Sequence, residues 1–127
     1  MKKTILVVDD QPQVRRLLRL VLDRDGYSVI EAEDESTAID AIRRHPEPVD
    51  MALVDIELPG RHGRQVAGTL NRMGITQTVF ITGLDPNQLF ADGRLEKGDP
   101  LVRKPFTVAG LTGVVKATLK PAPQPAV

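Results

Sequence analysis

The chain of 127 residues contains no cysteine and no tryptophan, and it has only one tyrosine and three phenylalanines. Without cysteine there is no disulfide, no thiolate ligand for zinc and no cysteine nucleophile, whereas the redox compartment stays open. So few aromatic side chains give little surface on which nucleic-acid bases could stack. These absences exclude thiol enzymes and thiolate metal centres, and they argue against a nucleic-acid-binding protein.

The sequence also lacks an excess of charge of one sign, because 17 Lys and Arg residues balance 17 Asp and Glu residues. No overall field draws the chain to nucleic acid or to an anionic membrane, so we expect direct binding to neither. The apolar stretch after Lys3 stops at Asp9, which is too short for a signal peptide, and no run could span a bilayer. We therefore expect a cytoplasmic protein.

Length and composition suit one domain, since 41% of the residues are hydrophobic and 127 residues leave no room for a second core. We expect this domain to span residues 1–120. Residues 121–127 read PAPQPAV, and this proline-rich sequence predicts a disordered tail or the start of a linker.

Helical patterns alternate with short apolar runs along this domain. The clearest pattern lies between Pro12 and Gly26, where the apolar residues that recur with helical spacing are Val14, Leu17, Leu18, Val21 and Leu22. Weaker stripes predict helices that end before Pro46 and at Gly74. A last helix follows Thr107 as its cap, with a stripe of Val108, Leu111, Val115 and Leu119.

Five β/α units of this kind predict a three-layer α/β fold, with a doubly wound sheet of five parallel strands and helices on both faces. We expect the flavodoxin-like strand order 2-1-3-4-5. Only the fourth helix is poorly predicted, because the residues between Gly83 and Gly98 include an internal glycine and few apolar positions. We expect a short or frayed helix there.

Four of the apolar runs lead to residues that handle phosphate or metal, and these are Asp9 with Asp10, Asp55, Thr82 and Lys104. The carboxyl ends of parallel strands meet at one edge of a sheet. In the expected strand order, the first and third strands flank the crevice where ligands bind. We therefore expect three carboxylates, one hydroxyl and one ammonium to share a pocket.

The residue types in this pocket predict its chemistry. Carboxylates without a nearby His or Cys suit Mg²⁺, with Mn²⁺ as the alternative, better than zinc. A carboxylate beside such a metal can attack a phosphoryl group while an ammonium neutralises the transferring oxygens. Asp55 is then the nucleophile and Lys104 supplies the ammonium. The hydroxyl of Thr82 and the N–H of Gly83 hydrogen-bond the product.

In order and spacing these residues, with the run DIELPG from Asp55 and the run Lys104-Pro105-Phe106, resemble the receiver domain of two-component response regulators. The resemblance covers nearly the whole chain and implies an aspartyl phosphate on Asp55, with phosphate contacts from Thr82 and Lys104. It also implies a Mg²⁺ site, whose ligands would be Asp10, Asp55, the backbone carbonyl of Glu57 and, through water, Asp9. A cis peptide bond before Pro105 is implied as well.

A receiver is expected to take its phosphoryl group from a histidine kinase or a histidine phosphotransfer protein. It catalyses its own phosphorylation and dephosphorylation and is a signalling domain rather than an enzyme that acts on other substrates. Its downstream protein partner is expected on the surface of the fourth helix, fifth strand and fifth helix. We expect a monomer or a weak homodimer.

Three features depart from the family pattern. Leu101 stands three residues before the lysine, where the family usually carries a Tyr or Phe that couples phosphorylation to the signalling surface. The fourth helix is weak in a region that a partner usually reads. His62 stands in a loop where acidic or small polar residues are more common, and we expect it to be solvated. His45 is expected to interact with the carboxyl end of a helix.

Three other functions stay open. A flavodoxin-type cofactor binder shares the topology, but it needs a glycine- or hydroxyl-rich phosphate cradle where this chain has DDQPQ. An aspartyl-nucleophile phosphatase often has a second acid two residues on, which Glu57 provides, although the D-x-D-x-T pattern of the haloacid dehalogenase-like family is missing. A receiver-like adaptor that works without phosphorylation is consistent with Leu101 and the weak fourth helix.

Overall fold

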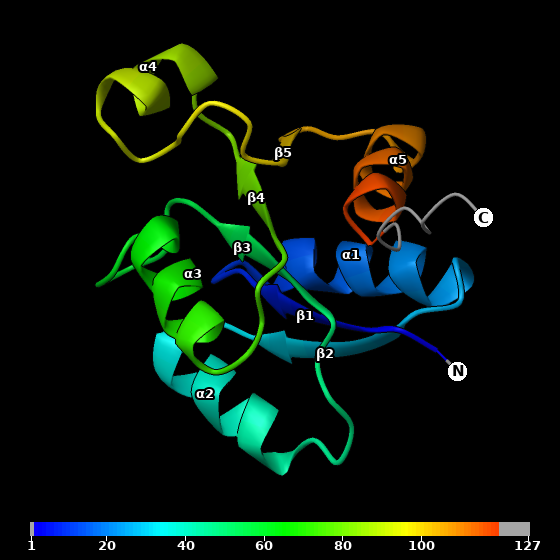
Figure 1. Cartoon of the computed structure of the whole chain (residues 1–127). Helices are drawn as coiled ribbons and strands as arrows, with labels where there is room; N and C mark the ends of the chain where they lie inside the picture. The colour runs from blue at the N-terminus through cyan, green and yellow to red at the C-terminus, as the bar shows by residue number, and fades with distance from the viewer. Residues whose placement is uncertain (1, 120–127) are drawn as a thin grey trace, which may run out of the picture.

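Five parallel strands form one sheet in the computed structural model, which describes residues 2–119. The strands are β1 (Thr4–Val8), β2 (Ser28–Ala32), β3 (Met51–Asp55), β4 (Thr78–Thr82) and β5 (Leu101–Arg103). They are hydrogen-bonded in the order β2-β1-β3-β4-β5 (Figure 1), which confirms the predicted doubly wound topology. The proline-rich sequence at 121–127, and its expected boundary with the domain, lie outside the described residues.

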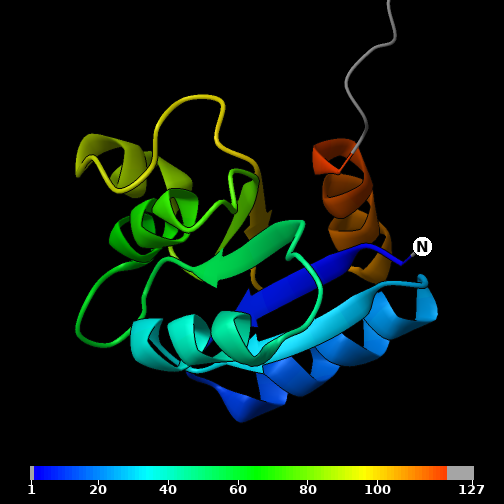
Figure 2. The same ribbon diagram turned by 60° about the horizontal axis from the view of Figure 1, so that its bottom comes forward.

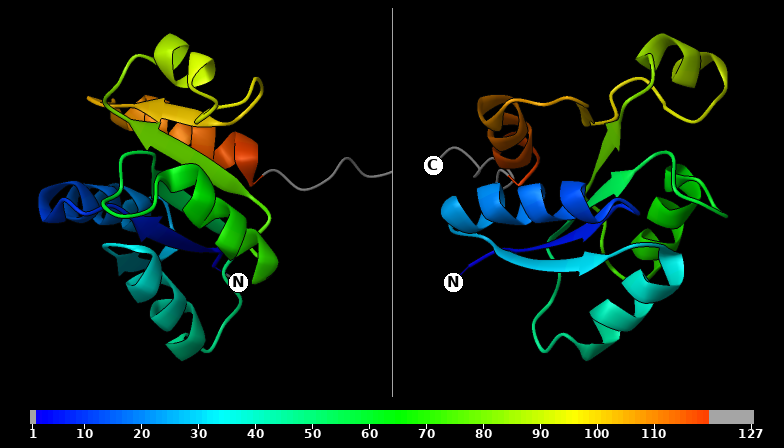
Figure 3. Two further views of the ribbon diagram at one scale, coloured as in Figure 1. Left: turned by 90° about the vertical axis from the view of Figure 1, so that its left-hand side faces the viewer. Right: turned by 180° about the vertical axis from the view of Figure 1, so that it is seen from behind.

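Helices cover both faces of this sheet. They are α1 (Pro12–Arg24), α2 (Glu35–Arg44), α3 (Gly63–Arg72), α4 (Pro86–Ala91) and α5 (Val108–Thr118). One face carries α1 and α5, the other carries α2 and α3, and α4 lies beyond β4 at the far end (Figures 1 and 3). None of these helices in residues 2–119 is both long enough and apolar enough to cross a membrane.

The hydrophobic core is divided between the two faces of the sheet. Along β1, Ile5 and Val7 point to the α1 and α5 side, whereas Leu6 and Val8 point to the α2 and α3 side. All residues of β1 and β3 are buried, because these strands have helices on both faces and a neighbouring strand on each edge. The ends of these two strands are therefore held rigidly.

Two residues that were expected in the core are exposed. Leu17 is 47% exposed and Val108 is 60% exposed, whereas the buried residues of the same stripes are Leu18, Val21, Leu22, Leu111 and Val115. The apolar stripe on α1 is wider than the face that the sheet and α5 cover, and Val108 is only the first residue of its helix. With Leu20, which is also exposed, these side chains line one hollow, called the α1–α5 patch below.

Side chains define the beginnings of two helices. At α2, the N–H of Thr37 donates to Oδ1 of Asp34 at 2.8 Å, and the N–H of Asp34 donates to the Thr37 hydroxyl at 3.1 Å. These hydrogen bonds from Thr37 hold the pKa of Asp34 below its ordinary value. At α5, the Thr107 hydroxyl accepts the N–H of Gly110 at 2.9 Å, which confirms the predicted cap.

The fourth helix is short, as expected from its weak pattern. It has six residues, and its cap Asp85 accepts the N–H of Asn87 at 3.0 Å. Leu89 is its buried residue, and Gly93 follows with a positive φ of 75°, a conformation that glycine adopts at little cost. The chain then runs through an irregular segment to β5.

Candidate functional site

The strands β1 and β3 end at the same edge of the sheet (Figure 2), and three carboxylates meet there. Asp9 follows β1 directly, Asp55 is the last residue of β3, and Val8 pairs with Val54 between the two strands. Carboxylate oxygens of Asp9, Asp10 and Asp55 all lie within 4.8 Å of one another. Because Asp9 and Asp55 are buried and Asp10 is exposed, the cluster is open to solvent on the Asp10 side.

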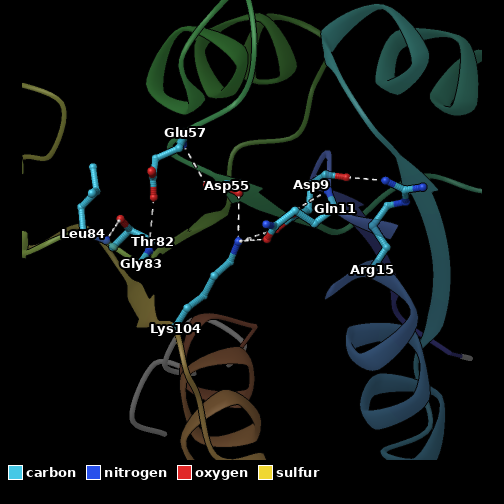
Figure 4. Close-up of polar contacts among 9 residues, drawn as sticks. All are labelled: Asp9, Gln11, Arg15, Asp55, Glu57, Thr82, Gly83, Leu84 and Lys104. Carbon is cyan, nitrogen blue, oxygen red and sulfur yellow. Dashed lines mark hydrogen bonds and ion pairs between the residues drawn. The ribbon is translucent and has the colours of Figure 1, made fainter. Parts of the chain in front are cut away.

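The ammonium of Lys104 lies between two of these carboxylates (Figure 4). Its Nζ is 3.0 Å from Oδ2 of Asp55 and 3.0 Å from Oδ2 of Asp9, and it donates to Oε1 of Gln11 at 3.2 Å. Burial acts to lower the pKa of Lys104, but the two carboxylates outweigh burial and raise this pKa above its ordinary value. The ammonium therefore stays charged and offsets part of the repulsion in the cluster.

Asp9 is held in place by the first turn of α1. Its Oδ1 accepts the N–H of Gln11 at 2.9 Å, and its carbonyl oxygen accepts the guanidinium of Arg15 at 2.6 Å. Its Oδ2 is buried and has no aligned hydrogen-bond donor among residues 2–119, since Lys104 is close but approaches off the hydrogen-bonding direction. Burial, reinforced by Asp55, raises the pKa of Asp9 against the opposing effects of Gln11 and Lys104.

Asp55 is fixed by the backbone that follows it. Its Oδ1 accepts the N–H of Glu57 at 2.8 Å, while its Oδ2 faces Lys104. Gly63, the first residue of α3, packs directly on this strand end and donates its N–H to the carbonyl of Ile56 at 2.9 Å. A Cβ on Gly63 would lie 2.4 Å from the carbonyl oxygen of Asp55, so only glycine fits.

Thr82 and Gly83 stand at the end of β4, next to the site, but their polar groups have other partners (Figure 4). Thr82 is fully buried, and its Oγ1 accepts the N–H of Leu84 at 2.9 Å. The N–H of Gly83 donates to Oε1 of Glu57 at 3.3 Å. The hydroxyl and the N–H that were predicted to contact a phosphoryl group therefore bind protein atoms in this structure.

A cavity of about 360 Å³ opens over the cluster, and the residues that line it are Asp10, Gln11, Asp55, Glu57, Gly83 and Lys104. Five of the predicted site residues thus share one wall, with Asp9 buried behind them and Thr82 beside them. Acidic groups together with a single ammonium suit a cation and a phosphoryl group bound side by side.

The donor atoms fit a hard divalent cation. Three carboxylates offer oxygen ligands at short mutual distances, and Oδ2 of Asp9 is a buried oxygen without an aligned donor. The cluster contains neither His nor Cys, which agrees with the expectation of Mg²⁺ or Mn²⁺ rather than zinc. The roles of the Glu57 carbonyl, and of Asp9 acting through water, stay predictions.

Other predicted positions lie at the margin of the site. The peptide bond before Pro105 is cis, as expected. Leu101 is half-buried at the start of β5 and packs on the core cluster that contains Phe80. His62 is half-buried before α3, and its expected solvation is wrong for Nδ1, which is buried without a partner among the described residues. His45 follows the carboxyl end of α2, as expected.

Two residues that support the site were not predicted. Gln11 both fixes Asp9 and accepts a hydrogen bond from Lys104, and Arg15 joins the carbonyl of Asp9 to Glu31 of β2, with an ion pair of 3.4 Å. Gln11 and Arg15 are four residues apart, so they project from one side of the start of α1. This spacing is the feature of the sequence from which the two residues could have been predicted. It does not show, however, whether Arg15 turns to the site or to solvent.

The family model for the response regulator receiver domain matches residues 5–116 of the chain. The chain is 33% identical over 122 residues to the response regulator GtcR of Aneurinibacillus migulanus, and 32% identical over 120 residues to the transcriptional regulatory protein ResD of Bacillus subtilis. These matches cover 96% and 94% of this chain but 50% and 49% of the two proteins, so the chain spans about half their length.

Among solved structures, the chain is similar to the response regulator TrrA of Thermotoga maritima, determined in complex with Mg²⁺ and BeF. The TM-score is 0.75 and the sequence identity is 30%, over 91% of this chain and 98% of that chain. The sheet order and the position of the acidic cluster agree with these similarities.

Proposed function

Because the chain belongs to the response regulator receiver domain family of two-component systems, we propose that it accepts a phosphoryl group on Asp55 and signals to a partner by a change of conformation. The observation that carries this choice of residue is the position of Asp55 on the cavity wall. Its Oδ2 faces the Lys104 ammonium at 3.0 Å, and its oxygens lie beside those of two further carboxylates.

In the proposed reaction, a carboxylate oxygen of Asp55 attacks the phosphorus of a phosphohistidine on a histidine kinase or a histidine phosphotransfer protein. A P–O bond forms as the P–N bond breaks, and the departing imidazole takes up a proton from solvent. Lys104 offsets the negative charge on the transferring oxygens, since its ammonium already lies beside the nucleophile. Entry of water into the same cavity lets the chain hydrolyse its own aspartyl phosphate.

A magnesium ion, with manganese as the alternative, is part of this proposal. Asp10, Asp55 and the backbone carbonyl of Glu57 would hold it directly, and Asp9 would hold it through water. The close carboxylates support these assignments, as do the buried Oδ2 of Asp9, which has no aligned hydrogen-bond donor among residues 2–119, and the complex of TrrA with Mg²⁺ and BeF. When bound, the metal supplies positive charge that stabilises the transferring phosphoryl group.

Two groups at the end of β4 would donate to the phosphoryl group when Asp55 is phosphorylated. The Thr82 hydroxyl, which now accepts from Leu84, donates its hydrogen to a phosphoryl oxygen, and the N–H of Gly83 leaves Glu57 for another. Both changes lie in the loop from β4 to α4. This loop is therefore the first part of the chain to respond.

We place the phosphodonor protein on the α1–α5 patch. Because α1 begins next to Gln11 on the cavity wall, a protein that brings a phosphohistidine to Asp55 passes over the first turns of α1. Leu17 and Leu20 are 47% and 59% exposed on these turns, and an apolar cluster on an otherwise polar helix face is typical of a protein contact.

Further parts of the proposal concern the downstream partner and the location. A downstream protein binds the surface of α4, β5 and α5, where Phe90 is 43% exposed. We retain the expectation of a monomer or a weak homodimer, with residues 1–120 as the receiver domain and 121–127 as a tail or linker. The location is the cytoplasm, since a histidine kinase draws its phosphoryl group from ATP.

One alternative has structural support, namely an adaptor that binds its partner without phosphorylation. The polar groups of Thr82 and Gly83 already have partners, and Leu101 is half-buried without the ring that usually responds. In such an adaptor, the arrangement seen here would itself be the form that the partner reads.

Intact-mass measurement after incubation with acetyl phosphate and Mg²⁺ decides between these functions. Wild type is expected to gain about 80 Da, the mass of one phosphoryl group, while Asp55→Asn gains nothing. Asp40→Asn, on the exposed side of α2, is the control and should label like wild type. Labelling of Asp55→Asn would refute the assignment of the site, and an unlabelled wild type would favour the adaptor. Steady release of phosphate from a phosphoester would favour the phosphatase.

A further inference from the structure

The segment that joins α4 to β5, residues 92–100, makes its polar side-chain contacts with α3 through one residue, Arg64, while its Leu95 is buried in the core cluster that contains Val66 and Leu70 of α3. Besides its backbone hydrogen bonds to α4 and β4, its polar side-chain contacts within residues 2–119 either stay inside the segment or end on Arg64. The internal contacts are the ion pair of Arg94 with Asp92 and the hydrogen bond from the N–H of Glu96 to Asp99. A change at Arg64 therefore removes every such contact between the segment and α3.

Arg64 holds the segment at three points. Its Nε donates to the carbonyl oxygen of Arg94 at 3.2 Å, one terminal nitrogen pairs with Asp99, and the other lies 3.7 Å from Oε1 of Glu96. The guanidinium also lies 5.4 Å from the centre of the Phe80 ring on β4. The side chains of Arg64 and Asp99 are only 27% and 21% exposed, so this pair is shielded from water.

The backbone next to Arg64 is fixed on the proposed phosphoacceptor. Gly63 lies against the carbonyl of Asp55 with no room for a Cβ, and its N–H donates to Ile56. The start of α3 cannot shift without moving the end of β3, which lies in the middle of the sheet. Arg64 therefore joins residues 92–100 to one of the most rigid parts of the molecule.

We propose that Arg64 clamps the α4–β5 segment to the start of α3 and limits how far this segment moves when Asp55 is phosphorylated. The inference rests on the proposed function, because it concerns the response to phosphorylation. The new hydrogen bonds of Thr82 and Gly83 form just before α4, and α4 itself has one buried side chain, Leu89, to resist a shift. The clamp opposes this shift at the far end of α4.

The clamp gives the chain a means of control that does not need an aromatic ring at the start of β5. Leu101 has no ring that could swing between buried and exposed positions, yet the segment that leads into it is held by charge. The planar guanidinium reaches the carbonyl of Arg94 and the carboxylate of Asp99 together, which a lysine cannot do. Loss of the Arg64–Asp99 pair is then the event that frees the signalling surface.

The clamp predicts a change in the response to beryllofluoride with Mg²⁺, measured as amide chemical-shift changes. The readout is the mean change over residues 94–101 divided by the mean change over residues 82–86. Arg64→Met is expected to raise this ratio about twofold, because the segment can then follow α4. Arg61→Met is the matched control, since Arg61 lies in the same stretch of chain but pairs with Glu35 of α2 at 2.9 Å. Its ratio should equal that of wild type.

Amide hydrogen exchange without the phosphate analogue tests the clamp by itself. Arg64→Met removes the pair and is expected to speed exchange over residues 94–100 about tenfold. Asp99→Asn keeps the accepting oxygen but loses the charge, so it is expected to speed this exchange by a smaller factor. Arg64→Lys keeps the charge but loses the planar guanidinium that bonds two groups at once. Its amide exchange rates over residues 94–100 should therefore lie between those of wild type and Arg64→Met. Asp99→Asn carries the test if Arg64→Met does not fold, because Asn keeps an oxygen for the N–H of Glu96.

The clamp and the proposed function fail in different ways. Wild-type exchange and an unchanged shift ratio in both Arg64→Met and Asp99→Asn would overturn the clamp, even with a normal response at residues 82–86. No response at residues 82–86 in wild type would refute the proposed function, whereas the exchange rates would still decide whether Arg64 holds the segment.

Discussion

Asp9 and Asp34 both accept a hydrogen bond from a backbone N–H, yet their pKa values shift in opposite directions. Burial and the nearby Asp55 raise the pKa of Asp9, because charge there is poorly solvated until a cation arrives. Asp34 lies at the more open start of α2, where the N–H and hydroxyl of Thr37 favour its charged form. An aspartate at the site is therefore destabilised by burial and by a neighbouring carboxylate, whereas an aspartate at the start of α2 stabilises that helix.

Asp34 makes a prediction about stability and pH. Its pKa is lowered on folding, so its contribution is present above the unfolded value of 3.8 and is lost as the pH falls through the lower folded pKa. At pH 7, Asp34→Ala is expected to lose about 1 kcal/mol of unfolding free energy, as for other helix caps. Asp34→Asn should lose less at pH 7 and should converge with wild type as the pH falls below 3.8 and through the lower folded pKa.

Urea unfolding of the three proteins across this pH range is the measurement. Asp40→Asn, a neutralised acid on the exposed side of the same helix, controls for the loss of one charge. A stability difference between wild type and Asp34→Asn that does not shrink on acidification would show that the carboxylate charge contributes nothing to this cap.

At the scale of single elements, α1 combines two tasks. Its first turn fixes Asp9 through Gln11 and Arg15, and its exposed side carries the apolar residues of the α1–α5 patch. The patch and the cavity share no lining residue, so a donor protein bound on this patch would dock outside the cavity and bring only its phosphohistidine to Asp55. The helix α4 differs, since it carries exposed Phe90 but none of its six residues lines the cavity.

The double variant Leu17→Ser, Leu20→Ser separates docking from chemistry. Labelling by acetyl phosphate is expected to stay at the wild-type rate, because neither residue lines the cavity. Transfer from the autophosphorylated histidine kinase that labels wild type fastest should fall about tenfold, as for the loss of an interface anchor. Phe90→Ser removes an exposed apolar side chain outside the patch and should not slow either reaction. Equal slowing by Phe90→Ser, or slower labelling by acetyl phosphate in the double variant, would contradict the patch as the donor site.

Leu101 limits how strongly the conformation of β5 can change when Asp55 is phosphorylated. Its side chain is half-buried and has no hydroxyl, so it gains little from moving as Thr82 turns to the phosphoryl group. Beryllofluoride with Mg²⁺ is expected to shift amide resonances strongly at residues 82–86 and 104–106, and less at residues 95–102. Leu101→Tyr should enlarge the changes at residues 95–102. A wild-type response there as large as at Thr82, or no gain in Leu101→Tyr, would mean that the signal follows another route.

At the scale of the whole molecule, the sequence predicted what local pattern determines. The sheet order and the meeting of Asp9, Asp10 and Asp55 at one edge follow from parallel strands that each lead to a polar residue. The exposure of Leu17 and Val108 could not be predicted, because periodicity gives the apolar side of a helix but not how much of it neighbours cover.

Contacts between distant parts of the chain also could not be predicted from the sequence. Arg64 and Asp99 are 35 residues apart, and Gln11 and Lys104 are 93 residues apart, so no local pattern connects them. Long polar side chains have many rotamers, and which partner each one meets is decided only after the strands and helices have packed. For this reason the sequence predicted which residues meet at the site, but it did not predict the residues that hold them in place.

Repulsion within the acidic cluster affects the stability of the whole protein, and Asp10 gives the clearest test. Asp10 is exposed and lies near two other carboxylates, so its removal relieves repulsion without leaving a buried group unpaired. Asp10→Ala is expected to raise the metal-free melting temperature by roughly 4 °C, corresponding to about 1 kcal/mol in a protein of this size. It should also abolish the rise in melting temperature that Mg²⁺ causes in wild type, since a ligand stabilises only a fold that binds it.

Calorimetry with and without Mg²⁺ measures both effects, with Asp40→Ala as the control for loss of an exposed acid. A variant that melts lower without metal, or that Mg²⁺ still stabilises as strongly as wild type, would show that these carboxylates do not form a cation site.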